Sequence, residues 1–416
     1  MISKFLLALT FCILCIFSVD AQCDQRYDEA ISDSFVLHKN IVYGSNITSD
    51  GDVVDLTMDI FEPSFPSETP RPVMILAHGG GFFDGSKEMA EVVWFCEDFA
   101  KRGFVTASIN YRKEASVLSL IDREKMIKAV IRATEDYKAA IRFFYRSAEE
   151  SNPYDIDADY IIVGGTSAGS IAAMHAVFMD EFYKLPSNYQ GWVQEIVGDT
   201  TMIGNSGNAG YPQEVAGIIN ISGAIISPIH LEDNADIPIF SAHNQVDLTI
   251  PYAWGHPYQL PFLPTLAGSL PIHKKMKEIG GYSKLYAINE INHVPHTNFD
   301  GTKNEEVYNT SMRRIADFLR YVVPCTEITT DIIDHQHQQL TVYPNPAKNR
   351  VEIKGLPNAQ EYIFSLMDIS GKVLEDRLII QQEQLDLGTH SNGLYFLIGA
   401  NTKTNDVLTG KLIIQN

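Results

Sequence analysis

The chain has 416 residues, of which 45% are hydrophobic and 20% are charged, and its formal net charge at pH 7 is −20. This composition is typical of a folded globular protein, and the length allows two or three domains, one of them with a large core. The strong negative charge argues against binding to nucleic acid or to an anionic membrane surface.

The first 21 residues form a predicted secretory signal peptide. Lys4 precedes an almost entirely apolar run from Phe5 to Ser18, and small residues follow at Val19 and Ala21. The run is too short to span a bilayer comfortably, and no other segment of the sequence reaches transmembrane length. We therefore expect cleavage after Ala21 and an exported mature protein without an integral membrane segment.

Three cysteines stay in the mature chain: Cys23, Cys96 and Cys325. In an oxidising compartment we expect one disulfide and one free thiol, but the spacing does not choose the pair. Three widely spaced cysteines do not make a metal site, and His335 and His337 fall in a polar stretch that is more typical of a linker than of ligands. The sequence therefore predicts no metal and no cofactor.

Strand-like and helix-like segments alternate from residue 35 to residue 322. Residues 53–61 alternate apolar and polar side chains as a half-buried strand does, whereas "VMILAH" at 73–78 is a continuous apolar run typical of a strand buried on both faces. The expected strands are 35–43, 53–61, 73–78, 104–111, 160–164, 215–221, 237–242 and 282–288, and the expected helices are 88–102, 123–148, 271–279 and 304–322. This order predicts an α/β fold with a mostly parallel sheet and helices on both faces.

Two connections are too long to be simple turns, residues 181–214 and 251–268, and both contain aromatic residues, Gly and Pro. Long loops inside compact domains usually have a functional role. We therefore expect these two segments to form a cap over a site.

The pattern changes at Cys325. Residues 326–339 are polar and lack periodicity, which predicts a linker. Residues 340–416 contain short strand-like runs separated by turn signals, which predicts a small all-β domain, a sandwich.

This terminal segment resembles the C-terminal sorting domain of the type IX secretion system of Bacteroidetes. The matching features are "VYPNPA" at its start, "ISGKV" in the middle, "NGLYFL" late and "KLIIQ" at the end. The resemblance implies that the secretion machinery is a partner of this chain and that the protein is exported across the outer membrane. Release and attachment to the cell surface are both compatible with it.

A serine stands at a tight corner between a buried strand and a helix, in Gly165-Thr166-Ser167-Ala168-Gly169. The pattern G-x-S-x-G is weak by itself, but a strand before it and a helix after it are the context in which it marks a nucleophile. Such a corner holds the serine in strained dihedrals and requires small flanking residues. It also places the hydroxyl at a helix N-terminus, which favours a developing negative charge.

A second glycine-rich segment, "HGGG" at 78–81, directly follows the strand at 73–78. Glycines allow backbone N–H groups to turn inward without obstruction by side chains. Together with the serine corner, this predicts an oxyanion hole to which N–H groups of this segment and of Ala168 contribute.

The acid and the base are expected after the serine, in the order Ser, acid, His. Asp247 follows the strand at 237–242, whereas Asp233 and Asp236 precede it and are worse placed. Two histidines follow the last strand, and His293 lies nearer to the strand end than His296 does. The sequence therefore predicts Asp247 as the acid and His293 as the base.

Residues 22–325 resemble an α/β-hydrolase of the carboxylesterase/lipase type, close to the hormone-sensitive-lipase-like esterases. The residues that carry the resemblance are "HGGGF", "NYR", "GTSAG", "VDLTIPY" and "NHVP". It implies a secreted serine ester hydrolase that forms an acyl-enzyme, with Ser167 as nucleophile, Asp247 as acid and His293 as base. It also implies that the N–H groups of Gly80, Gly81 and Ala168 are the oxyanion donors. One position departs from the family pattern: Thr166 stands where these esterases usually have Asp or Glu.

The sequence does not select the ester substrate. Phe82, Tyr252 and Trp254 lie beside the predicted catalytic loops and are candidates for a substrate pocket, with ordinary loop packing as the competing interpretation. Plant cell-wall esters, acylglycerols and polyesters all fit an exported hydrolase. One alternative function is a serine peptidase of the same fold, which the absence of propeller-like repeats and the "HGGG" segment disfavour. Another is a non-catalytic surface binding protein, which would lack a member of the triad.

Overall fold

A computed structural model describes residues 27–323 and 341–415. The gaps within these ranges are 68, 117, 119–120, 199–200, 349, 355–361, 369–372, 379–383, 388–389 and 402–406. The chain divides into two compact units, Met1–Cys325 and Thr326–Asn416. The predicted signal peptide (1–21), Cys23, Cys325 and the predicted linker (326–339) lie outside the described residues.

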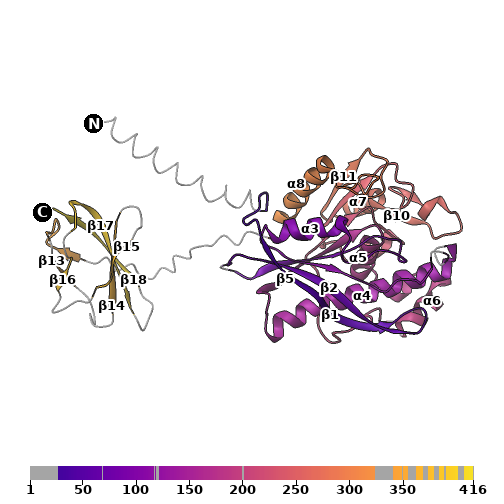
Figure 1. Ribbon diagram of the computed structural model, residues 1–416, viewed down its shortest axis with the longest axis horizontal. Helices are drawn as coiled ribbons and strands as arrows, with labels where there is room; N and C mark the ends of the chain where they lie inside the picture. Colours follow the sequence, from indigo (N-terminus) through magenta and orange to yellow (C-terminus); the bar gives the residue numbers. More distant parts are fainter. Residues whose placement is uncertain are drawn as a thin grey trace. The chain divides into compact units, whose positions relative to one another are not determined.

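An eight-stranded sheet forms the centre of the first unit (Figure 1). Its strands are β1 (Phe35–Ile47), β2 (Val53–Pro63), β3 (Arg71–Ala77), β4 (Val105–Ile109), β5 (Ile156–Thr166), β6 (Gly217–Ile221), β8 (Ile239–Asn244) and β11 (Ser283–Ile288). They lie in the order β1-β2-β4-β3-β5-β6-β8-β11. The pairs β1–β2 and β2–β4 are antiparallel, and every other neighbouring pair is parallel. The predicted mostly parallel sheet is therefore confirmed.

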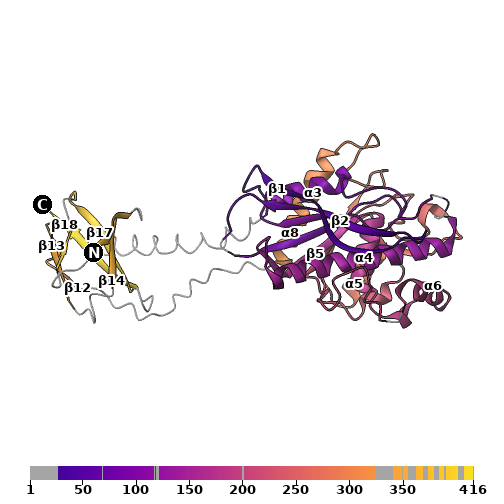
Figure 2. The ribbon, with the colours of Figure 1, turned by 60° about the horizontal axis from the view of Figure 1, so that its bottom comes forward.

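Helices cover both faces of this sheet (Figure 2). They are α3 (Ala90–Ala100), α4 (Arg123–Glu150), α5 (Ala168–Phe178), α6 (Ser187–Val197), α7 (Ser269–Glu278) and α8 (Glu305–Val322). Val73 and Ile75 of β3 pack into a core with α4, α5 and α7, whereas Met74 and Leu76 pack into a second core with α3 and α8. Alternate residues of one strand thus serve both cores, which explains why the strand at 73–78 is apolar throughout.

The connections that were too long for turns contain structure of their own. Residues 181–214 include α6, whose Tyr189, Val193 and Val197 pack against Ile127 and Ile131 of α4. Residues 251–268 include β9 (Trp254–Gly255) and β10 (Leu266–Gly268), which form a small sheet with β7 (Ala224–Ile225). Short 3₁₀ helices lie nearby: η2 (Phe182–Lys184), η3 (Pro228–Leu231) and η4 (Pro257–Gln259). Helix α6 and these short strands were not predicted.

The second unit is a sandwich of two antiparallel sheets, as predicted. One contains β12 (Thr341–Tyr343), β13 (Arg350–Lys354) and β16 (Gln384–Asp386), and the other contains β14 (Tyr362–Asp368), β15 (Val373–Leu378), β17 (Gly393–Asn401) and β18 (Val407–Ile414). A single core takes Val342 and Ile353 from the first sheet and Phe364 and Leu397 from the second. Within the described parts of both units, none of the helices combines the length and the apolar character that crossing a membrane requires.

Candidate active site

The corner between β5 and α5 holds Ser167 in a strained conformation, with φ 51° and ψ −118°. Its two glycines lie against the end of β3. A Cβ atom on Gly165 would stand 2.3 Å from the carbonyl oxygen of Ala77, and one on Gly169 would stand 2.2 Å from the same atom. A side chain at either position would collide with backbone, so the motif requires glycine on both sides of the serine. The strain is held by the packing of β5 and α5 against β3.

His293 lies between Ser167 and Asp247. Its Nε2 atom is 2.6 Å from Ser167 Oγ, and its Nδ1 atom is 2.6 Å from Asp247 Oδ2. With the proton of a neutral imidazole on Nδ1, the ring donates to the carboxylate and accepts from the serine hydroxyl. This is the geometry in which an imidazole can take the proton of a serine.

The Asp247 carboxylate is buried and fully engaged. Its Oδ1 atom accepts hydrogen bonds from the N–H groups of Thr249 at 2.8 Å and Ile250 at 3.1 Å, and His243 Nε2 lies 3.2 Å from Oδ2. Burial by itself raises the pKa of Asp247, but the hydrogen bonds from His243 and His293 outweigh burial and lower the pKa to about 2. The Asp247 carboxylate therefore stays ionised at neutral and mildly acidic pH.

Two side chains at the ends of strands fix the loop that presents His293. Ser222, just after β6, donates its hydroxyl to the carbonyl of His293 at 2.6 Å. Asn244, the last residue of β8, donates its amide to the carbonyl of Asn292. These hydrogen bonds hold the backbone of Asn292 and His293 and so fix the position from which the His293 side chain extends.

The alternative acid and base positions lie elsewhere. His296 is buried, and its Nε2 atom lies 2.9 Å from the carbonyl of Glu91, to which it donates. Burial lowers the pKa of His296 to about 4, so the ring is neutral. Asp233 is exposed and pairs with Lys184. Of the predicted candidates, the structure brings His293 and Asp247 together with Ser167.

Glu91, in the first turn of α3, was not predicted as a site residue. Its Oε1 atom accepts a hydrogen bond from the N–H of Gly79 at 2.9 Å and another from the hydroxyl of Thr166. The carboxylate thus links the glycine-rich segment to the serine corner. No spacing pattern could have found it, because Glu91 precedes Thr166 by 75 positions and an acidic residue in a first helical turn is commonplace.

The glycine-rich segment forms a tight turn at the carboxyl end of β3. Gly80, Gly81 and Phe82 all have positive φ, at 104°, 61° and 66°, and the carbonyl of Gly80 accepts from the N–H of Asp84 at 3.0 Å. Gly81 lines the same cavity as Ser167 and Ala168. Ala168 is the first residue of α5, so its N–H has no acceptor within the helix.

The cavity beside Ser167 has about 560 Å³ of empty space, including its open mouth. Its wall is mainly aliphatic. The aliphatic lining residues are Met126, Ile127, Val130, Ile171, Ile226, Ile250, Pro257, Pro264 and Leu266, and the others include Phe82, His175 and Tyr258. A second cavity of about 270 Å³ shares Ile127, Val130, His175 and Ile226 with the first and extends to Tyr189 and Val193 of α6. The two long connections, 181–214 and 251–268, therefore both contribute to walls near the site.

Of the three predicted pocket aromatics, only Phe82 is a lining residue of this cavity. Tyr252 packs edge-on against His243, with ring centroids 5.7 Å apart, and Trp254 is 58% exposed. Sequence proximity to a catalytic loop was thus a poor guide to lining, and Tyr258 was overlooked because it lies further along the same connection.

The described residues contain no group of three or more His, Cys, Asp or Glu side chains arranged to hold a metal ion. Cys96 is buried and is not part of a disulfide. Because Cys23 and Cys325 lie outside the described residues, the expected disulfide stays a prediction.

Comparison with known proteins identifies both units. Residues 58–203 match the sequence model of the BD-FAE family, and residues 341–415 match that of the secretion system C-terminal sorting domain. Solved structures similar to this chain include esterase 2 of Thermogutta terrifontis in its apo form and with propionate bound. Each is 19% identical with a TM-score of 0.48, covering 68% of this chain and 94% of its own. The same esterase phosphorylated by paraoxon covers 70% and 95%, also at 19% identity and a TM-score of 0.48. No curated protein matches the sequence.

The fold and the family match define the first unit as an esterase-type α/β-hydrolase. The chain thus combines an esterase-type unit, in which residues 58–203 are similar to the BD-FAE family, with a type IX secretion C-terminal sorting domain. It is accordingly an exported hydrolase, either released or attached to the cell surface.

Proposed function

We propose that the protein is a serine carboxylic-ester hydrolase in which Ser167 is the nucleophile, His293 the general base and Asp247 the acid. The observation that carries the proposal is the chain of hydrogen bonds from Ser167 through His293 to Asp247, each 2.6 Å long. This chain ends in an apolar cavity at a helix N-terminus, which is where an acyl group and a developing negative charge would both be stabilised.

The mechanism follows from this geometry. Ser167 Oγ attacks the ester carbonyl carbon while His293 Nε2 accepts the serine proton, and the anionic Asp247 stabilises the imidazolium that forms. The N–H groups of Gly80, Gly81 and Ala168 hold the oxyanion, and removal of one such donor typically lowers the rate about 10²–10³-fold. The alcohol leaves with the proton from His293, and water then hydrolyses the acyl-enzyme by the reverse sequence.

The cavity wall supports an ester with an aliphatic acyl group. The polar side chains in the wall are few, and the ring of His175 is engaged, because its Nδ1 atom lies 2.7 Å from the carbonyl of Ile171 and its Nε2 atom accepts from the N–H of Ile226 at 3.2 Å. Burial lowers the pKa of His175 to about 4, so no charge faces the acyl group. Acylglycerols and aliphatic polyesters fit this wall better than a strongly polar acyl group does.

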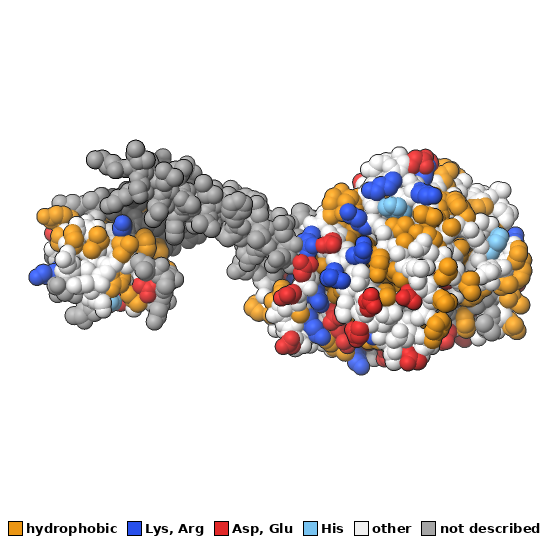
Figure 3. Space-filling view, turned by 90° about the horizontal axis from the view of Figure 1, so that it is seen from above, with side chains coloured by type: hydrophobic (Ala, Val, Ile, Leu, Met, Phe, Trp, Pro, Cys, Tyr) orange, Lys and Arg blue, Asp and Glu red, His pale blue; other side chains and the backbone are white. Residues whose placement is uncertain are grey.

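Exposed apolar side chains next to the triad point to the same class of substrate. Leu248 follows Asp247 directly and is 62% exposed, and Ile291 precedes His293 by two positions and is 67% exposed. On the face shown in Figure 3, hydrophobic side chains gather at the right-hand end of the first unit, whereas charged side chains lie mainly to their left. An apolar surface around the site favours approach of a poorly soluble ester.

The two units also have separate roles in this proposal. Residues 22–325 carry the chemistry, residues 326–339 link the units, and residues 340–416 present the chain to the type IX secretion machinery after removal of the signal peptide at 1–21. The support for this division is that each unit has its own core and its own family match.

Replacement of Ser167 by Ala tests the proposal. We expect kcat for p-nitrophenyl butyrate to fall about 10⁴-fold or more, because the nucleophile is lost while binding is kept. A fluorophosphonate should label the wild-type protein on Ser167, as mass spectrometry of its peptides would show, and should leave Ser167→Ala unlabelled. The urea unfolding midpoint of the variant serves as the control for an intact fold. Undiminished turnover in Ser167→Ala would refute the assignment.

A further inference from the structure

Tyr258, which lines the cavity, and the residue after it adopt a left-handed backbone although neither is glycine. Tyr258 has φ 54° and ψ 16°, and Gln259 has φ 57°. This backbone conformation is unfavourable for a residue with a side chain and persists only where the surroundings dictate it. Here the N–H of Tyr258 donates to the carbonyl of Thr249 at 2.7 Å, and the N–H of Gln259 donates to the carbonyl of His256 at 3.1 Å. The strained pair is therefore tied to the loop that carries Asp247.

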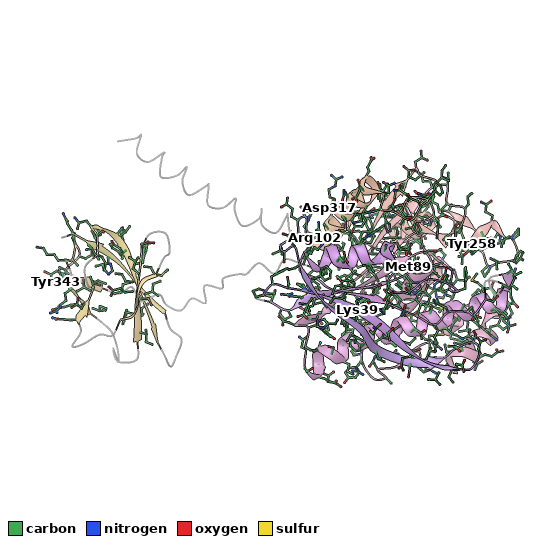
Figure 4. All side chains as sticks on the ribbon, viewed as in Figure 1. Lys39, Met89, Arg102, Tyr258, Asp317 and Tyr343 are labelled. Atoms are coloured by element: carbon green, nitrogen blue, oxygen red, sulfur yellow. The ribbon has the colours of Figure 1, made fainter. Side chains whose placement is uncertain are left out.

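The strained backbone aims the side chain of Tyr258 at the glycine-rich segment. A Cβ atom on Gly81 would stand only 2.7 Å from Tyr258 Oη, so the phenol hydroxyl lies against the backbone of Gly81. Tyr258, Gly81 and Ser167 line one cavity. Figure 4 labels Tyr258 at the right-hand end of the first unit, the end at which hydrophobic side chains gather in Figure 3.

Tyr258 is 37% exposed, and its hydroxyl has no hydrogen-bond partner among the described residues, whereas the hydroxyls of the buried Tyr111 and Tyr137 do. Tyr111 donates to the carbonyl of His78 at 3.0 Å, and Tyr137 donates to the carbonyl of Ile75 at 2.6 Å. Burial raises the pKa of Tyr258, and no charged neighbour opposes this, so its O–H proton stays in place. The hydroxyl is therefore available to donate a hydrogen bond to an oxygen atom of a ligand in the cavity that Tyr258 lines.

We propose that Tyr258 is a catalytic residue whose phenol donates a hydrogen bond to the oxyanion formed on the ester carbonyl, beside the N–H of Gly81. This rests on the proposed function. When Ser167 Oγ bonds to the carbonyl carbon, the π electrons of the carbonyl move to its oxygen and the serine proton moves to His293. Tyr258 keeps its proton and stabilises the new negative charge. The charge returns to the carbonyl as the bond to the alcohol breaks, and the alcohol takes the proton from His293.

Replacement of Tyr258 by Phe removes the hydroxyl and keeps the ring. We expect kcat for p-nitrophenyl butyrate to fall about 10²-fold, with KM changed less than about twofold, because the lost hydrogen bond exists mainly in the transition state. A trifluoromethyl ketone that adds to Ser167 forms the same oxyanion and should bind about 10²-fold more weakly to the variant. Tyr145→Phe is the matched control, since the Tyr145 hydroxyl donates to the carbonyl of Glu214, away from the cavity.

The outcomes of these experiments distinguish this inference from the proposed function on which it rests. Unchanged kcat in Tyr258→Phe overturns the inference, and so does a loss confined to KM, which would put the hydroxyl on a part of the substrate remote from the carbonyl. Ester turnover by the wild-type protein that disappears in Ser167→Ala keeps the proposed function in either case. Turnover that survives in Ser167→Ala would instead remove both.

Discussion

Thr166, the residue before Ser167, stands where the esterases that this sequence resembles usually have an acidic residue. The structure supplies a carboxylate there from another element, because the Thr166 hydroxyl donates to Glu91 of α3. The same oxygen of Glu91 accepts from Gly79. A carboxylate acting through Gly79 and Thr166 holds two proposed catalytic segments in register without contacting the substrate itself.

Replacement of Glu91 by Ala should therefore lower kcat about 10–10²-fold, because the glycine-rich turn would lose its anchor to the serine corner. KM should change less, and Glu91→Gln should retain more activity than Glu91→Ala, since its amide oxygen can still accept both hydrogen bonds. Steady-state kinetics on p-nitrophenyl butyrate measure both effects. Glu88→Ala is the control on the same segment, where the side chain is 69% exposed. Equal kinetics for Glu91→Ala and Glu88→Ala would rule out this positioning role.

The site residues that could be predicted from the sequence are those that belong to a local sequence pattern. Ser167 sits in G-x-S-x-G, and Asp247 and His293 follow strands in the expected order. Glu91 and Tyr258 carry no such pattern, because each meets the site only through the packing of distant segments. A tertiary contact of this kind leaves no periodicity or spacing to detect.

At the scale of elements, helix α4 decides how deep the proposed acyl site is. Met126, Ile127 and Val130 lie on one face of the helix and line the cavity beside Ser167. Ile127 and Val130 also line the second cavity, on the side of α6. The position where the two cavities meet sets the length of acyl chain that can enter.

Replacement of Val130 by Phe should shorten the accepted acyl chain. The larger ring would fill the space between the two cavities, so the ratio of kcat/KM for p-nitrophenyl octanoate to that for p-nitrophenyl acetate should fall about tenfold or more. A series of esters from acetate to decanoate measures the effect. An unchanged chain-length profile would show that long acyl groups leave the site by another route, through the open mouth of the cavity.

The elements themselves were largely predictable, because their signals are local. The strand at 73–78 and the helix at 123–148 correspond to β3 and α4 with small shifts at their ends. Helix α6 was not predicted, because Gly191 in its middle and its few apolar residues weaken the helical pattern. Its position depends on packing against α4. Strands β9 and β10 have only two and three residues, too short for any periodicity to appear.

At the scale of the whole molecule, several histidines are buried in the first unit, and three of them, on separate elements, have a pKa of about 4. They are His78 after β3, His175 in α5 and His296 after β11. Burial lowers the pKa of each to about 4. The histidines of an unfolded chain titrate near about 6.5. Between these two values the unfolded state binds more protons than the folded state does.

The stability of the first unit should therefore fall as the pH drops below about 6.5. Between the unfolded pKa and about pH 4, each of the three histidines makes the free energy of unfolding fall with a slope that approaches about 1.4 kcal/mol per pH unit. Above the unfolded pKa, the stabilisation from each histidine is fully present. The carboxylate of Asp247, with its pKa lowered to about 2, adds a loss only at still lower pH. The free energy of unfolding should thus decline steeply from pH 6 to 5.

Urea unfolding followed by tryptophan fluorescence can measure this in the full chain. Trp94, Trp192 and Trp254 are all the tryptophans of the sequence, so the signal reports the first unit and not the sorting domain. His296→Phe should make the decline measurably smaller, because the phenyl ring packs among the same aromatic side chains and takes up no proton on unfolding. A free energy of unfolding that stays constant down to pH 5 would mean that these histidines are protonated within the fold, contrary to their burial.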